Sequence, residues 1–182
     1  MDSYKFVEGV YFYFVTFTLT DWLPIFISPE PIEIVVDNLK FCITEKSLQV
    51  HAYVVMPNHM HLIVSDETFD NERLQKTLTG FRKITGHKLA GYIDRALLIS
   101  LSTVTRNSAS DDRSRQVWKP GWHAEAIASE QFLVQKANYI HENPVRKGLV
   151  RSAEDWVHSS ACYWTNRESA EIPIAPIVIS HM

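Results

Sequence analysis

Two histidines stand two residues apart in the stretch His59-Met60-His61. On an extended strand, residues two apart project from the same face, so both imidazoles would lie side by side while Met60 points to the other face. A pair of neutral imidazoles is a natural half-site for a divalent metal ion. Ordinary hydrogen-bonded histidines on a half-buried sheet face explain an isolated His-x-His pattern equally well, so the metal interpretation needs a second element.

That second element is the stretch Asn-Tyr-Ile-His-Glu-Asn-Pro-Val at residues 138–145. Tyr139 and Asn143 are four residues apart, so their side chains share one face of any helix that reaches Asn143. A tyrosine hydroxyl is protonated at neutral pH and attacks poorly, but a nearby cation favours the phenolate and can polarise a phosphate oxygen. Attack by Tyr139 on a DNA phosphorus would form a phosphotyrosine link, which a free 3'-hydroxyl can later reseal.

The order of the elements around these motifs predicts the α+β fold class. Periodicity predicts strands at residues 12–20, 48–56, 60–64 and 117–127, the last of them central, and helices at 33–43, 69–93 and 129–143. This order is typical of a ferredoxin-like split βαβ antiparallel sheet with helices on one face and an added C-terminal helix. Gly80 and Gly86 weaken the second helix and permit a bend. Ser129 is the expected N-cap of the third.

Residues 1–182 are expected to form a single domain, because 46% hydrophobic residues supply a sizeable core. The polar stretch at about 100–116 is expected to be a mobile loop. The apolar, proline-broken tail at about 166–182 must pack within this chain or on a partner.

Cysteine and hydropathy patterns indicate a cytoplasmic protein with no membrane partner. Cys42 and Cys162 lie far apart in the sequence and suggest neither a disulfide framework nor a thiolate zinc site, which fits a reducing compartment. The apolar run at 10–19 is too short to span a bilayer, and it reads as a first strand.

The net charge of -3 argues mildly against wholesale nucleic-acid binding, but one segment is locally basic. Residues 73–95 carry six basic side chains and one acid. Arg82, Lys83 and Lys88 within this segment are expected to contact DNA phosphates. A solvated helix face explains the same charges equally well.

Three ordered motifs together resemble one protein family. The motifs are Pro-Asn-His-Met-His-Leu at 57–62, the tyrosine segment extended through Arg-Lys-Gly-Leu-Val to 150, and Glu-Asp-Trp-Val-His-Ser-Ser-Ala at 154–161. They look like the motifs of the single-tyrosine HUH transposases of insertion sequences. Within that superfamily they most resemble the REP-associated tyrosine transposases. The resemblance covers about residues 12–164 and is weakest in the polar loop.

The resemblance implies a role for each motif residue. His59 and His61 would be the HUH pair and Tyr139 the nucleophile, while Asn143 matches a position where insertion-sequence relatives place a glutamine metal ligand. An amide oxygen suits Mg²⁺ or Mn²⁺. The implied activity is nicking and strand transfer on single-stranded or hairpin DNA through a 5'-phosphotyrosine, by a monomer or homodimer.

Several alternatives remain open from the sequence. Asn143 could cap its helix instead of binding metal, and His123 with Glu125 forms a competing i, i+2 pair, whereas His141 is read as structural. A DNA-binding protein that recognises repeat elements without cutting them is a different functional class. A hydrolase that activates metal-bound water is a third, and it would leave Tyr139 dispensable.

Overall fold

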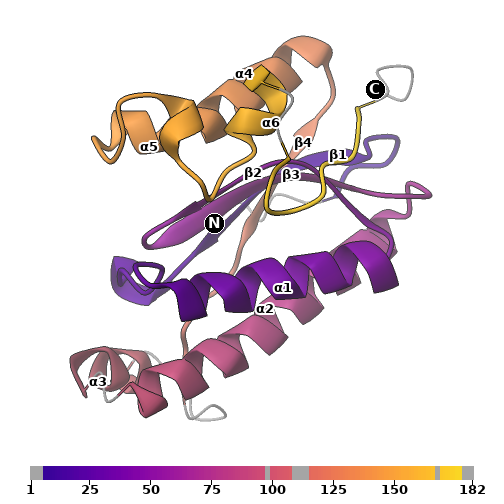
Figure 1. Ribbon diagram of the computed structural model, residues 1–182. Coiled ribbons are helices and arrows are strands. Elements are labelled where there is room, and N and C mark those ends of the chain that lie inside the picture. Colours follow the sequence, from indigo (N-terminus) through magenta and orange to yellow (C-terminus); the bar gives the residue numbers. More distant parts are fainter. Residues whose placement is uncertain (1–5, 97–98, 108–114, 167–168, 178–182) are drawn as a thin grey trace.

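The computed structural model describes residues 6–96, 99–107, 115–166 and 169–177 (Figure 1). One antiparallel sheet has the strand order β2-β3-β1-β4. The strands are β1 (Phe12–Thr18), β2 (Leu48–Met56), β3 (His59–Asp66) and β4 (His123–Ile127). This order confirms the predicted ferredoxin-like split βαβ arrangement.

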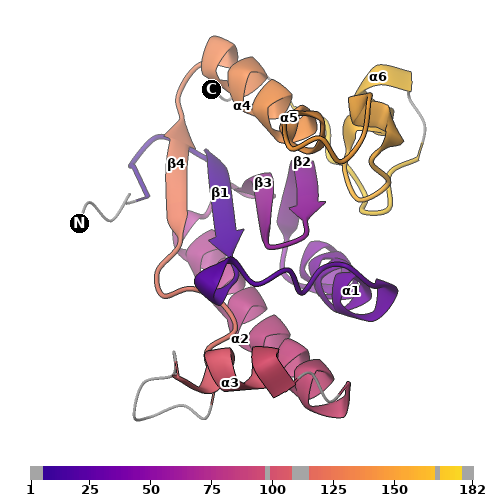
Figure 2. The same ribbon diagram turned by 90° about the vertical axis from the view of Figure 1, so that its left-hand side faces the viewer.

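Helices cover both faces of the sheet (Figures 1 and 2). The α-helices are α1 (Pro29–Glu45), α2 (Asn71–Arg95), α3 (Ile99–Asn107), α4 (Glu130–His141), α5 (Asn143–Arg146) and α6 (Ala161–Asn166), and the short 3-10 helices are η1 (Thr20–Trp22) and η2 (Ala153–Asp155). α1 and α2 pack on one face, and α4, the added helix, packs on the other. Ser129 caps α4 as predicted, because its Oγ accepts the N–H of Phe132 at 3.3 Å. No helix in the described ranges is long and apolar enough to cross a membrane.

Alternate residues of β1 fill two separate cores. Tyr13, Val15 and Phe17 pack in the larger core with side chains of α1 and α2. Phe12 and Phe14 point the opposite way and pack in the smaller core with side chains of α4. Because successive side chains of a strand point to opposite faces, both faces of the sheet are buried here. The odd-numbered residues of β1 pack toward α1 and α2, and the even-numbered ones toward α4.

The prediction of a mobile loop at 100–116 is wrong where the loop would begin, because α3 occupies that stretch. The serine and threonine residues of this stretch argued against a helix, because their hydroxyls usually compete for backbone hydrogen bonds. Here the Thr105 hydroxyl donates to the carbonyl one turn earlier at 2.9 Å, and the Thr105 carbonyl accepts the N–H of Gln116 at 2.8 Å. Residues 108–114 of the predicted loop lie outside the described residues.

The last strand is shorter than predicted and lies at the sheet edge, so its expected central position is wrong. Pro120 has no N–H for a ladder, and Gly121 adopts a φ of +72°, so the chain turns before β4 begins. Upstream of this turn, Trp118 still pairs with Leu19 in an antiparallel bridge, and its side chain packs against α2. A Cβ on Gly86 would lie 3.2 Å from the Trp118 Cδ1 atom, so the glycine permits this close approach, and α2 runs on without interruption.

The C-terminal tail packs within this chain along the exposed edge of β2. Ile172 is fully buried in the larger core, and the Ala175 N–H donates to the Val50 carbonyl at 2.8 Å. Further along the same strand, the Val55 N–H donates to the His158 carbonyl at 2.8 Å. These bonds satisfy backbone groups that an uncovered edge strand would offer to other chains.

We expect Ile172→Ala to lower the free energy of unfolding by about 2–4 kcal/mol, because it leaves a cavity in the larger core. Urea denaturation of the two proteins measures the difference. Ile174→Ala, at a half-buried position in the same tail, is the matched control and should cost about 1 kcal/mol or less. Equal stability of Ile172→Ala and the wild type would contradict this packing.

Candidate metal and nucleophile site

β3 presents its two histidines on the face that α4 covers. The His59 and His61 ring centroids lie 4.8 Å apart, and the side chains are 7% and 5% exposed. Met60 is buried in the larger core on the opposite face, as predicted. The Phe14 ring stacks on His61 with centroids 5.1 Å apart, so the pair borders the smaller core. The strand period thus places both imidazoles side by side.

Each histidine is oriented by a bond to its Nδ1 atom. His59 Nδ1 lies 2.7 Å from Asn58 Oδ1, and His61 Nδ1 lies 2.8 Å from Thr16 Oγ1. Asn58 Oδ1 is an acceptor, so His59 Nδ1 carries the proton and the lone pair of His59 is on Nε2. The Thr16 hydroxyl can accept from His61 Nδ1, which leaves the same lone pair on His61 Nε2. No residue in the described ranges hydrogen-bonds either Nε2 atom. This is the arrangement of metal-binding histidines, whose second nitrogen is held by an oxygen.

The environment keeps both imidazoles neutral. Burial lowers the pKa of His59 to about 4, and the charge of Lys147 lowers it further. Burial likewise lowers the pKa of His61 to about 3, helped by His59, Lys136 and Arg146. Neutral imidazole is the form that coordinates metal, so no proton has to leave at physiological pH.

Tyr139 lies on α4 beside this pair. Its ring centroid is 5.3 Å from that of His61 and 5.8 Å from that of Phe14, and its residue is 40% exposed. The Arg146 guanidinium lies 4.6 Å from the ring centroid, and its Nη2 donates to the Tyr139 carbonyl at 2.7 Å. The tyrosine is therefore fixed in position and still accessible to a large substrate.

Asn143 stands one turn after Tyr139, at the start of α5. Glu142 between them keeps helical backbone angles, so α4 and α5 form a nearly continuous turn. Asn143 is 5% exposed, and its side chain makes no hydrogen bond within the described ranges. Its amide atoms are not among the fully buried atoms that lack a partner, so the amide keeps contact with solvent and can accept a ligand, whereas the capping alternative lacks its hydrogen bond.

The competing pair on β4 is not assembled into a site. Glu125 forms an ion pair with Lys136 at 2.5 Å, and His123 is exposed. In the described part of the chain, no three or more His, Cys, Asp or Glu side chains gather in a group that could hold a metal ion. His141 contacts the Ser160 hydroxyl at 2.8 Å, which fits its structural reading. The pair of His59 and His61 is therefore the best-formed candidate.

The predicted DNA-binding residues lie on the other side of the sheet. Arg82, Lys83 and Lys88 belong to α2, whereas Tyr139 belongs to α4 (Figure 2). Arg82 donates to the Lys119 carbonyl at 2.6 Å, while Lys83 and Lys88 are exposed. Arg82 and Lys83, but not Lys88, line a groove of about 640 Å³. The structure thus separates this basic face from the histidine pair.

Three cations near the histidines were missed by the sequence reasoning. Lys136, Arg146 and Lys147 are close enough to lower the pKa of one or other histidine. A signal existed, because Lys136 precedes Tyr139 by three residues, close to one helical turn. These cations place positive charge beside the histidine pair.

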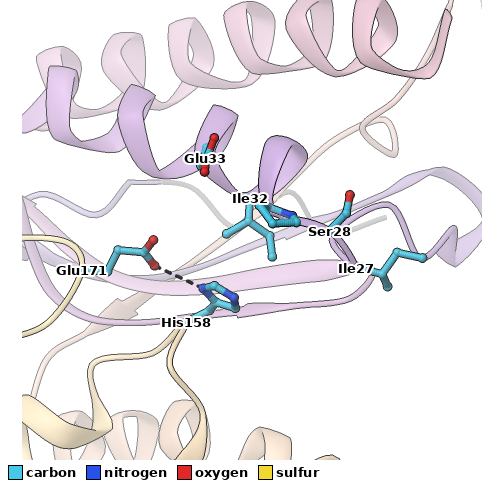
Figure 3. A pocket seen from close by; sticks show the side chains of 7 residues that line it. Ile27, Ser28, Ile32, Glu33, His158 and Glu171 are labelled. Atoms are coloured by element: carbon cyan, nitrogen blue, oxygen red, sulfur yellow. Dashed lines mark hydrogen bonds and ion pairs between the residues drawn. The ribbon is translucent and has the colours of Figure 1, made fainter. Parts of the chain in front are cut away.

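A separate cavity of about 200 Å³ lies beside the start of α1 (Figure 3). His158 Nδ1 and Glu171 Oε2 face each other across 3.2 Å within it. Glu33 adds a second carboxylate to the lining. Two acids in this small space would repel phosphate, so the cavity is a poor site for a nucleic-acid backbone.

Comparisons with known proteins identify a similar fold. Neither a scan against family models nor a search of curated proteins finds a match. A solved REP-associated tyrosine transposase bound to a REP hairpin is similar over 98% of this chain and 94% of its own, with 18% identity and a TM-score of 0.58. A protein described as a transposase from Deinococcus radiodurans has 17% identity and a TM-score of 0.45, over 79% of this chain and 97% of its own. The chain therefore has the fold of the REP-associated tyrosine transposase.

Proposed function

We propose that this chain is a single-tyrosine HUH transposase that nicks and rejoins single-stranded or hairpin DNA. The observation that carries the proposal is the row of rings formed by His59, His61 and Tyr139, in which both Nε2 atoms are unbonded and the tyrosine is exposed. The fold shared with a transposase bound to a REP hairpin supports DNA as the substrate.

The proposed reaction is an exchange of two phosphorus–oxygen bonds. The Tyr139 hydroxyl loses its proton and attacks a DNA phosphorus, and the bond from phosphorus to the 3'-oxygen breaks. The 3'-oxygen takes up a proton, and the 5'-phosphate stays on Tyr139. Attack by a 3'-hydroxyl on this link re-forms a DNA strand and releases the tyrosine, so strand transfer needs no external energy source.

His59, His61 and Asn143 would hold Mg²⁺ or Mn²⁺, since imidazole nitrogen and amide oxygen suit these ions. When bound, the ion would polarise a phosphate oxygen and favour the phenolate. Arg146 and Lys147 supply charge that holds the phosphate near Tyr139, whereas the charge of Lys136 is paired with Glu125.

Trapping of a covalent adduct tests this proposal. Labelled single-stranded and hairpin oligonucleotides are incubated with the protein and Mn²⁺, and the adduct is mapped by peptide mass spectrometry. The expected product carries the DNA 5'-phosphate on Tyr139 and leaves a free 3'-hydroxyl. An adduct on another residue would contradict the assignment.

Recognition of repeats without cutting is the alternative, and the groove beside α2 gives it an observation of its own. Arg82, Lys83 and Arg115 are among the residues that line the groove. Binding of hairpin DNA with neither nick nor adduct, at saturating Mn²⁺, would favour this alternative over the enzyme.

We expect Lys83→Gln with Lys88→Gln to weaken hairpin binding and to reduce the slope of log affinity against log salt by about 1–2, as expected for the loss of two phosphate contacts. Fluorescence anisotropy across a salt series measures the slope. Lys76→Gln on the same helix is the control, because this lysine already pairs with Glu72 at 2.6 Å. An unchanged slope in the double variant would place the DNA elsewhere.

A further inference from the structure

One exposed aromatic ring adjoins the candidate site without a role in the proposed chemistry. Trp22 is 54% exposed, and the protein's other four tryptophans, all within the described ranges, are buried or half-buried. Its ring centroid lies 5.8 Å from that of His59, edge to face. Trp22 thereby extends the row of rings that runs through His59 and His61 to Tyr139.

The backbone that presents this ring is strained. Asp21 and Trp22 have φ values of 49° and 56°. These values lie in the left-handed region, which is unfavourable for residues other than glycine. The Trp22 N–H donates to the Leu19 carbonyl at 3.1 Å, and the Leu19 N–H donates to the Asn58 carbonyl at 2.9 Å. The strained turn is thus tied to the residue that also orients His59. Such strain persists only where the surrounding structure enforces it, and it concentrates at functional sites.

We propose that Trp22 is the stacking platform for a nucleobase adjacent to the phosphate that His59, His61 and Tyr139 engage. An exposed indole gains by stacking on a base, and every base offers a suitable face. The phosphate chain would follow the cations near Tyr139, while the neighbouring base turns onto Trp22. This inference rests on the proposed function for the position of the scissile phosphate, but base stacking can be measured without cleavage.

Binding of two oligonucleotides to the full chain tests the platform. One is a labelled oligothymidylate, and the other has the same backbone with abasic sites throughout. Both are measured in the Tyr139→Phe background, so that cutting does not interfere. We expect Trp22→Ala to weaken oligothymidylate binding about tenfold and to leave binding of the abasic strand unchanged. Trp22→Phe should restore most of the lost affinity, because a smaller ring still stacks.

Matched controls separate stacking from damage to the fold. Phe41→Ala removes an exposed aromatic ring on α1, on the opposite face of the sheet, and should change neither affinity. Equal losses on both oligonucleotides would show that Trp22 acts through His59 or the fold and would overturn the platform, as would no loss on either. If wild-type protein forms no adduct but Trp22→Ala still discriminates between the strands, the proposed cleavage fails and the platform stands.

Discussion

Tyr139→Phe is expected to abolish both nicking and adduct formation while leaving the fold, metal binding and DNA binding intact. The substitution removes only the hydroxyl, so the ring still packs beside His61, Phe14 and the Arg146 guanidinium. Loss of a covalent nucleophile reduces rates by several orders of magnitude, so cleavage should fall below detection. Denaturing gels with labelled single-stranded or hairpin DNA and Mn²⁺ measure both products.

Tyr163→Phe is the matched control, because it removes the hydroxyl of a half-buried tyrosine on α6. It should cut at the wild-type rate. The same experiment separates the three functional classes. A hydrolase that uses metal-bound water would still cut in Tyr139→Phe, and a pure binding protein would not cut even in the wild type. Cutting that persists without the Tyr139 hydroxyl would end the nucleophile assignment.

The sheet could be predicted because its pattern depends on neighbouring residues alone. Alternation along β3, and along β2 after the irregularity between Val50 and Ala52, sets which side chains face which helix layer, and the Pro57-Asn58 turn joins the two strands directly. His59 and His61 could be placed on one face for the same reason. Neither inference requires knowledge of a distant contact.

The errors arose where distant contacts decide the structure. α3 is rich in serine and threonine, and one of its threonine hydroxyls is satisfied within the helix itself. Trp118 lies ahead of the Pro120-Gly121 turn, bridges Leu19 next to β1, and packs its ring in the larger core against Gly86 of α2. A short window of sequence does not show which distant residue a side chain will pack against.

The positions of the charged residues around the histidine pair could not be predicted from local sequence either. A cluster of basic residues on α2 is visible in the sequence, but the side of the sheet on which α2 packs is a property of the whole fold. Lys136 stands alone in the sequence and Arg146 with Lys147 forms only a pair, yet the turn from α4 into α5 brings them to the histidines. Local charge density therefore predicted a basic surface and missed the cations beside the histidine pair.

His59→Ala and His61→Ala are each expected to abolish cleavage, because one remaining imidazole cannot hold the metal ion in place. Manganese affinity, measured by isothermal titration calorimetry, should fall by at least about 100-fold. The overall fold should remain, since the strand ladder does not depend on either side chain, and the urea midpoint checks this. Wild-type cleavage by either variant at saturating Mg²⁺ would rule out the metal site.

A graded variant distinguishes loss of a ligand from loss of packing. Thr16→Val removes the hydroxyl that lies 2.8 Å from His61 Nδ1 but keeps a side chain of nearly the same shape. Manganese affinity should fall about tenfold, because the imidazole loses the bond that holds its orientation. Unchanged affinity in Thr16→Val, together with full loss in His61→Ala, would mean that Thr16 does not orient the ligand. Losses in both, in this order of size, are what a metal held by Nε2 of an oriented His61 requires.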